Sequence, residues 1–165
     1  MEIKGTGAAR RLKKFTGKFA ALTLALTLIG GGNEVRAQTL VSAQRPLVIQ
    51  NDRGGVLTQR LREIRALRQS RRPIEIRGGV CFSTCTMYLG LPNTCISPNT
   101  TFGFHGPSSY GRALDPEMFN RASRVISRFY PAPLKSWYMN EARYQINTIA
   151  KVKGANIIRM GVRAC

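Results

Sequence analysis

Residues 46–77 constrain the fold of this chain more than any other stretch, because two strand patterns flank a helical one. The apolar run 46–49 stops at a cluster of turn residues, 50–55. Beyond this cluster, apolar side chains recur at helical spacing up to Pro73, and residues 74–77 then alternate as a short strand. A strand, a helix and a second strand joined by a crossover of this length predict a parallel pair.

Short strands and helices continue to alternate beyond this unit. Asp115 and Pro116 mark one helix start, with an acidic N-cap followed by a proline at the first helical position. The elements that we predict after residue 77 are an apolar helix at 81–91, strands at 94–96 and 101–105, and helices at about 116–129, 134–150 and 154–160. This alternation is typical of an α/β fold, here a mostly parallel sheet with surrounding helices.

The first 37 residues have the pattern of a secretory signal. Basic residues precede an eleven-residue apolar run, 19–29, which is too short to span a membrane, and residues 35–37 offer a cleavage site. We therefore expect a signal peptide at residues 1–37 and an exported protein, periplasmic or extracellular. An uncleaved membrane anchor is the less favoured alternative. The Arg10-Arg11 pair leaves both Sec and twin-arginine export open. Residues 38–165 then form a single domain.

The part of the chain after the predicted cleavage site is strongly basic. Residues 1–37 hold seven of the 26 basic and two of the eight acidic residues, so residues 38–165 keep 19 basic and six acidic residues, a net charge of +13. Such a charge favours anionic partners, but no nucleic-acid-binding motif accompanies it. We expect a solvated basic face that meets an anionic envelope component rather than a specific nucleic acid. Much of this face belongs to the first helix, with Arg60, Arg62, Arg65, Arg68, Arg71 and Arg72.

All four cysteines follow the predicted signal peptide. They are Cys81, Cys85, Cys95 and Cys165. An even number of cysteines in an exported chain predicts two disulfides, and three connectivities are open. The spacing does not match the paired ligands of a zinc site, so we expect no metal.

Ser83 and His105 are the candidate catalytic residues. Ser83 lies at the start of the predicted apolar helix, where unpaired backbone N–H groups suit an oxyanion hole. His105 is the only histidine and therefore the only neutral-pH base available to a serine hydroxyl. Both residues follow strands that run the same way, so a parallel sheet would bring them to one edge. A serine and a lone histidine are also compatible with purely structural roles.

Three motifs around these residues resemble the proteolytic subunit of Clp protease and its crotonase-superfamily relatives. Residues 50–55 (QNDRGG) resemble the family's I-N-S-P-G-G turn, residues 79–84 (GVCFST) its G-x-x-A-S-M nucleophile turn, and residues 98–107 (PNTTFGFHGP) its P-N-S-x-x-x-x-H-Q-P histidine strand. Residues 81–85 (CFSTC) and 161–165 (GVRAC) are similar to the C-x-S-A-C and G-V-R-x-C motifs of exported, Cys-bearing Clp-like bacterial proteins. The resemblance covers residues 47–105 and loosely the last dozen.

The resemblance implies roles for particular residues. Ser83 would be the nucleophile and His105 the general base, and the N–H groups of Thr84 and of the Gly54-Gly55 turn would form the oxyanion hole. The reaction would be acyl transfer from a peptide or acyl substrate, without a cofactor. The family also implies a homo-oligomer. An ATP-dependent chaperone and a crotonase-like acyl-CoA activity are not expected outside the cytoplasm.

This sequence departs from the family at the third triad member, because no carboxylate occurs in residues 145–151, where the family has its Asp. Asn147 could orient the imidazole, and Glu141 and Asp115 are acidic alternatives. Arg53 replaces the family's proline and either binds an anionic substrate group or adds to a basic rim. A serine peptidase or acyl hydrolase is the leading function. The alternative is a catalytically degenerate envelope protein that binds an anionic partner through its cleft or its basic face.

The implied fold also suggests how the cysteines pair. Disulfides Cys85–Cys95 and Cys81–Cys165 would pin the nucleophile turn to the sheet and to the C-terminus. A cysteine nucleophile is a weaker competitor to Ser83, because an oxidising compartment would consume the thiols.

Overall fold

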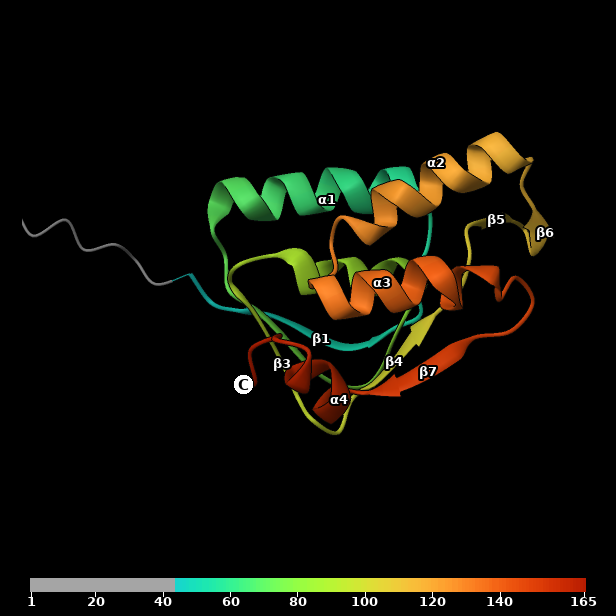
Figure 1. Ribbon diagram of the computed structural model, residues 1–165. Coiled ribbons are helices and arrows are strands. Elements are labelled where there is room, and N and C mark those ends of the chain that lie inside the picture. The colour runs from blue at the N-terminus through green and yellow to red at the C-terminus, as the bar shows by residue number, and fades with distance from the viewer. Residues whose placement is uncertain (1–43) are drawn as a thin grey trace, which may run out of the picture. The chain divides into compact units, whose positions relative to one another are not determined.

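The computed structural model describes residues 44–165 and confirms an α/β fold with a mixed, mostly parallel sheet (Figure 1). The predicted signal peptide lies outside the described residues. In chain order the elements are β1 (Leu47–Asp52), α1 (Leu57–Ser70), β2 (Ile74–Phe82), the 3-10 helix η1 (Ser83–Gly90), β3 (Thr94–Ile96), β4 (Thr101–Phe104), β5 (Ser108–Ser109), β6 (Arg112–Ala113), α2 (Pro116–Ser127), α3 (Ala132–Asn140), the 3-10 helix η2 (Ala142–Tyr144), β7 (Ala150–Lys153) and α4 (Gly154–Arg159).

The main sheet is built around β2, whose neighbours follow the order β1-β2-β4-β7. The predicted parallel pair is confirmed as β1 and β2. On the other side of β2, its first half pairs with β3 and its second half with β4, both in parallel. The edge strand β7 runs antiparallel to β4. Three parallel strands, β1, β2 and β4, therefore end at the same edge of the sheet.

Strand β2 is longer than predicted. We expected the strand to cover residues 74–77 and a helix to begin at Cys81, but the strand continues to Phe82 and the helix that follows is a 3-10 helix. A Cβ atom on Gly78 would lie 1.1 Å from the carbonyl oxygen of Gln50, where the register between β1 and β2 shifts. The glycine therefore lets two strands approach closely and does not end the strand.

The first two helices form where the sequence predicts them, and both lie on one side of the sheet in Figure 1. The apolar positions of α1 turn toward the core, with Ile64 fully buried. Asp115 caps α2 by accepting the backbone N–H of Met118 at 2.9 Å. The prediction that the arginines of this helix form a solvated face is wrong for Arg60. This residue is buried, with a relative exposure of 9%.

The predicted helix at 134–150 is wrong in its second half. Helix α3 ends at Asn140, and residues 150–153 form the edge strand β7. Ala150 and Val152 are half-buried and alternate with two exposed lysines, which is the period of a strand with one face on the core. The helical pattern therefore stops well before this alternation begins.

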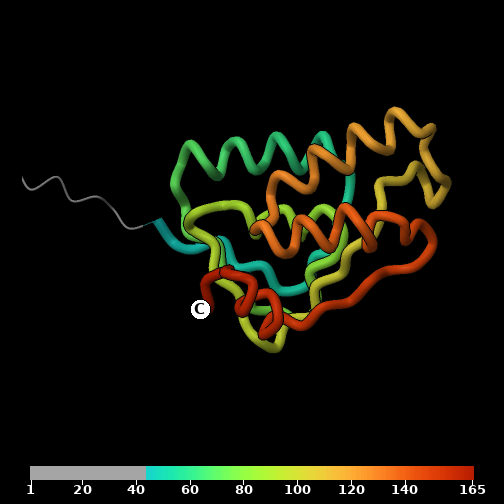
Figure 2. The backbone as a smooth tube through the Cα atoms, viewed as in Figure 1, coloured from blue at the N-terminus to red at the C-terminus, as the bar shows by residue number. Residues whose placement is uncertain are grey.

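All four cysteines are in disulfides, but the expected pairing is wrong. The bonds are Cys81–Cys85 and Cys95–Cys165. The first joins the end of β2 to the first turn of η1, and the Cα atoms of its two cysteines lie 5.3 Å apart. The second joins β3 to the end of the chain, and Figure 2 shows that terminal segment returning to the sheet. There the N–H of Cys165 donates to the carbonyl of Ile96 at 3.1 Å. Within residues 44–165, no helix has the length and apolar character needed to cross a membrane.

Candidate active site

The shared edge of the three parallel strands carries the residues that the sequence singled out. Gly54 and Gly55 follow β1, Ser83 and Thr84 follow β2, and His105 follows β4. Four of these five residues line one pocket of about 580 Å³; Gly54 lies just behind its wall, against Ser83. The structure therefore brings the predicted nucleophile, the predicted base and two predicted oxyanion residues to one cavity.

The pocket has a neutral and mostly apolar lining. Among residues 44–165, the only ionisable side chains that line it are His105 and two tyrosines. The remaining residues of the wall are Val56, Leu57, Thr58, Thr86, Phe104, Gly106, Pro107, Ser108, Ser109, Tyr110, Leu114, Ile126 and Tyr130. In a chain with a net charge of +18, the absence of lysine and arginine from this lining means that the pocket suits an uncharged, apolar group.

Ser83 occupies an unusual backbone conformation at the junction of β2 and η1. Its φ is +55°, in the left-handed region that non-glycine residues rarely adopt. A serine on a sharp strand-to-helix turn exposes its hydroxyl at the sheet edge, and such a turn is a known way to present a nucleophile. Gly54 must be a glycine here, because its φ is +95° and an added Cβ would lie 2.4 Å from the Ser83 Cβ.

Hydroxyl groups hold the turn from both sides. Thr86 donates to the Ser83 carbonyl at 2.6 Å and lies 2.6 Å from the hydroxyl of Tyr130, which can donate to it. Thr84 donates to the carbonyl of Gly55 at 3.4 Å, so the residues after β1 and after β2 are linked directly. The Thr84 N–H is one of the first in η1 and has no partner within that helix. The Thr84 N–H also has no backbone acceptor elsewhere within residues 44–165, so it can bind a negatively charged oxygen.

The His105 ring has a backbone partner, the carbonyl of the next residue. Its Nδ1 lies 2.7 Å from the carbonyl oxygen of Gly106. Because a carbonyl only accepts, this contact requires the proton on Nδ1 and leaves Nε2 as the basic nitrogen. The Gly106 N–H donates to the Gln145 carbonyl at 2.8 Å, which anchors the segment.

The residues suggested as a third triad member lie elsewhere. Asn147 and Glu141 are exposed and do not line the pocket, and Asp115 is the cap of α2. Arg53 is also exposed and outside the lining; its guanidinium lies 5.8 Å from the centre of the Phe82 ring. No sequence signal points to the Gly106 carbonyl, because every residue has a carbonyl.

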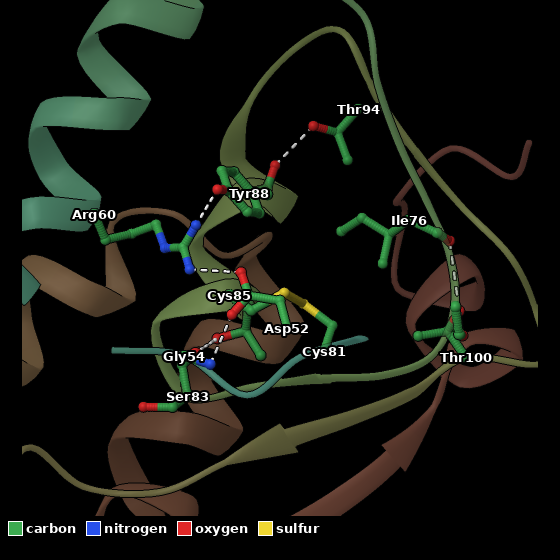
Figure 3. Close-up of a disulfide and its surroundings, with 12 residues drawn as sticks. Asp52, Gly54, Arg60, Ile76, Cys81, Ser83, Cys85, Tyr88, Thr94 and Thr100 are labelled. Carbon is green, nitrogen blue, oxygen red and sulfur yellow. Dashed lines mark hydrogen bonds and ion pairs between the residues drawn. A yellow bond between two sulfur atoms is a disulfide. The ribbon is translucent and has the colours of Figure 1, made fainter. Parts of the chain in front are cut away.

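A charged network that sequence reasoning missed lies behind the Gly54-Gly55 turn (Figure 3). The Asp52 carboxylate accepts the Gly54 N–H at 2.7 Å through Oδ1 and pairs with Arg60 Nη2 at 2.5 Å through Oδ2. Arg60 also pairs with Glu63 at 2.8 Å and contacts the hydroxyl of Tyr88. The Gly54 N–H is therefore already hydrogen-bonded to Asp52, whereas the Gly55 N–H has no hydrogen-bond partner within residues 44–165.

Two tyrosines near the site have shifted pKa values. Burial raises the pKa of Tyr88 above its ordinary value, and the hydrogen bond that Tyr88 donates to Glu63 at 2.5 Å adds to the shift. Burial also raises the pKa of the pocket residue Tyr130. Both hydroxyls consequently remain protonated donors at neutral pH.

The hairpin β5–β6 is a further part of the wall that the sequence analysis missed. Tyr110 and Gly111 form its turn with φ values of +50° and +77°, the sign that a two-residue type I′ hairpin requires. Ser108, Ser109 and Tyr110 line the pocket beside His105. Gly111, which lies in the polar stretch 108–112, was the sequence signal that could have predicted this turn.

Searches with protein-family models and against curated proteins found no match to this chain. Among the residues that the structure describes, no group of three or more His, Cys, Asp or Glu side chains could hold a metal ion.

Proposed function

We propose that this protein is a serine acyl hydrolase, acting on a peptide or ester bond, with Ser83 as nucleophile and His105 as general base. The observation that carries the proposal is the pocket itself. Ser83, His105, Gly55 and Thr84 come from three strand ends and share one cavity wall. The apolar lining favours a substrate with an uncharged, apolar group next to the bond that is cleaved.

The proposed reaction is acyl transfer in two steps. The Ser83 Oγ attacks the substrate carbonyl while His105 Nε2 takes its proton, and the N–H groups of Gly55 and Thr84 stabilise the oxyanion. His105 then protonates the leaving amine or alcohol, and an acyl-Ser83 intermediate forms. In the second step His105 takes a proton from water, which attacks the acyl group and releases the acid.

The Gly106 carbonyl supports this mechanism only in part. A carbonyl at 2.7 Å from Nδ1 holds the imidazole in the useful tautomer, as a triad aspartate does. It carries no negative charge, so it stabilises the imidazolium less. We therefore expect slow turnover compared with a full triad.

We also infer a Clp/crotonase-type fold and export from the cytoplasm. The mostly parallel sheet and the order of the motifs along it support the first inference. The two disulfides support the second, because disulfides persist in oxidising compartments.

The test is labelling of the oxidised protein, from residue 38 onward, with a fluorophosphonate probe. Wild-type protein should be labelled, and Ser83→Ala and His105→Ala should each lose labelling by at least about 100-fold. Ser136→Ala, an exposed hydroxyl on α3 outside the pocket, is the matched control and should label as wild type. A folded wild-type protein that does not label, or labelling that survives in Ser83→Ala, would contradict the proposal.

A second candidate function is binding of an anionic envelope component through the outer face of α1. Arg62, Arg65, Arg68 and Arg71 are exposed, and none of them is in an ion pair within residues 44–165. The neutral lining of the pocket favours this face over the cleft as the anion-binding surface. Salt-dependent retention on an anionic resin would support it if elution shifts to clearly lower salt when these four residues are changed to Gln.

A further inference from the structure

The turn after β1 is held by a carboxylate that faces two ways. One oxygen of Asp52 accepts the Gly54 N–H at 2.7 Å, and the other lies 2.5 Å from the Arg60 guanidinium. Gly54 thus cannot donate to a substrate while this bond is formed. Gly55, the next residue, lines the pocket and keeps its N–H.

Arg60 is in turn held on several sides. It is buried, it pairs with Glu63, and its guanidinium stacks over the Tyr88 ring with 4.5 Å to the ring centre. Tyr88 donates to Glu63 at 2.5 Å and so completes the cluster. Figure 3 shows Arg60 reaching from α1 toward Asp52 and Tyr88. The register partner of Asp52 on β2 is Cys81, which forms the disulfide with Cys85.

The cluster connects the two halves of the candidate oxyanion hole. Asp52 is the last residue of β1, directly before the turn that holds Gly55, and Tyr88 belongs to η1, the helix that begins with Ser83 and Thr84. Burying charged groups contributes little net stability compared with apolar side chains of the same size. Arg60 is buried, whereas Asp52 is part-buried and Glu63 is exposed. The pairing of a buried arginine with Asp52 at this position is therefore better explained by the geometry that it imposes than by the stability that it adds.

We propose that Asp52, oriented by Arg60, is a positioning residue that fixes the Gly54-Gly55 peptide and selects Gly55 as the oxyanion donor opposite Thr84. This inference rests on the proposed function. The family resemblance implied that the whole Gly54-Gly55 turn forms one side of the oxyanion hole. In this proposal only the Gly55 N–H donates to the oxyanion, and Gly54 serves to let the turn pack against Ser83. The Thr84 hydroxyl bond to the Gly55 carbonyl completes the link between the two donors.

The test compares Asp52→Ala with Asp52→Asn in the oxidised protein. Asp52→Ala should slow fluorophosphonate labelling about 10- to 100-fold, because the oxyanion donor is no longer fixed. Asp52→Asn keeps an oxygen that accepts the Gly54 N–H and should recover most of the rate. Glu75→Ala is the matched control, since it removes a carboxylate paired with Arg77 outside the pocket and should label as wild type.

Amide hydrogen exchange provides a readout that does not depend on activity. The Gly54 amide should be protected in wild type and in Asp52→Asn, and should exchange at least about tenfold faster in Asp52→Ala. If Asp52→Ala does not fold, Arg60→Gln replaces it. Without the guanidinium, the Asp52 carboxylate is no longer oriented toward the Gly54 N–H.

Two results would overturn the assignment of Asp52. These are a folded Asp52→Ala protein with wild-type labelling and Gly54 exchange, or an Asp52→Asn variant as impaired as Asp52→Ala. Absence of labelling in wild type, with Gly54 protection that depends on Asp52, would instead refute the hydrolase and leave the turn-fixing role standing.

Discussion

At the scale of single residues, the site depends on backbone conformations that side-chain chemistry does not reveal. Ser83 adopts a left-handed φ between a strand and a helix, a conformation that costs a non-glycine residue about 1 to 2 kcal/mol. The neighbouring disulfide, the Thr86 hydroxyl and the packing of Gly54 all hold it there. Strain of this kind persists where the surroundings impose it, often at functional sites.

The conformation of Ser83 predicts an unusual order of stabilities. Ser83→Gly should be more stable than Ser83→Ala by about 1 kcal/mol, because glycine adopts this φ without steric cost. At Ser136, exposed on α3, the order should be reversed by about 1 kcal/mol, because glycine disfavours helix. Urea unfolding of the four variants measures both differences. Equal stability of the two Ser83 variants would contradict the assigned strain.

At the scale of elements, the two disulfides have different tasks. Cys81–Cys85 spans four residues and ties β2 to η1 around Ser83. Cys95–Cys165 spans 70 residues and ties β3 to the end of the chain. A crosslink that closes a long loop removes more entropy from the unfolded chain than one that closes a short loop. The first bond therefore acts mainly on the site and the second mainly on global stability.

Paired substitutions test this division. Replacing Cys95 and Cys165 by serine should lower the free energy of unfolding by about 4 kcal/mol, against about 2 kcal/mol for Cys81 and Cys85. The Cys81/Cys85 variant should nonetheless lose more of the fluorophosphonate labelling rate, since it releases the nucleophile turn. Guanidinium unfolding and labelling kinetics on the same samples check the two orders. If the Cys95/Cys165 variant is folded and loses more of the labelling rate than the Cys81/Cys85 variant, the proposed division between the two disulfides is wrong.

At the scale of the whole molecule, buried tyrosines join the helices to the sheet. Tyr130 and Tyr138 pack edge to face at 5.2 Å, and Phe104 of β4 meets the ring of Tyr130 at 5.5 Å. Burial raises the pKa of Tyr88, Tyr130 and Tyr138 above the ordinary value of 10.0. The folded protein consequently holds these protons at a pH where the unfolded chain has released them.

This linkage predicts sensitivity to alkali. Above pH 10 the folded state binds more protons than the unfolded state, so the free energy of unfolding should fall as pH rises, by up to about 1.4 kcal/mol per pH unit for each tyrosine. Thermal unfolding between pH 8 and 11.5 measures how the free energy of unfolding falls with pH. In Tyr138→Phe this fall should be less steep, because one of the three tyrosines no longer contributes to it. An unchanged slope in that variant would refute a contribution from Tyr138.

The family resemblance, and not the residue pattern, predicted that the Gly54-Gly55 turn lies beside Ser83 and His105. The residue pattern was sufficient to predict the α/β class, the parallel β1–β2 unit and the placement of Ser83 and His105 at one edge of the sheet. These features follow from local information. Apolar periodicity and end signals such as Asp115-Pro116 define the elements, and parallel strands end at one edge of a sheet. A residue that follows such a strand is thereby placed without knowledge of its contacts.

Contacts in the folded chain, by contrast, set the disulfide pairing, the burial of Arg60, the strand at 150–153 and the partners of His105 and Gly54. Each of these depends on contacts between groups far apart in the sequence or on backbone atoms common to all residues. An arginine on a helix has the same sequence signal whether water or Asp52 and Tyr88 surround it. Its environment is set by which strand and which helix pack against α1, because pairing a buried charge requires partners from both.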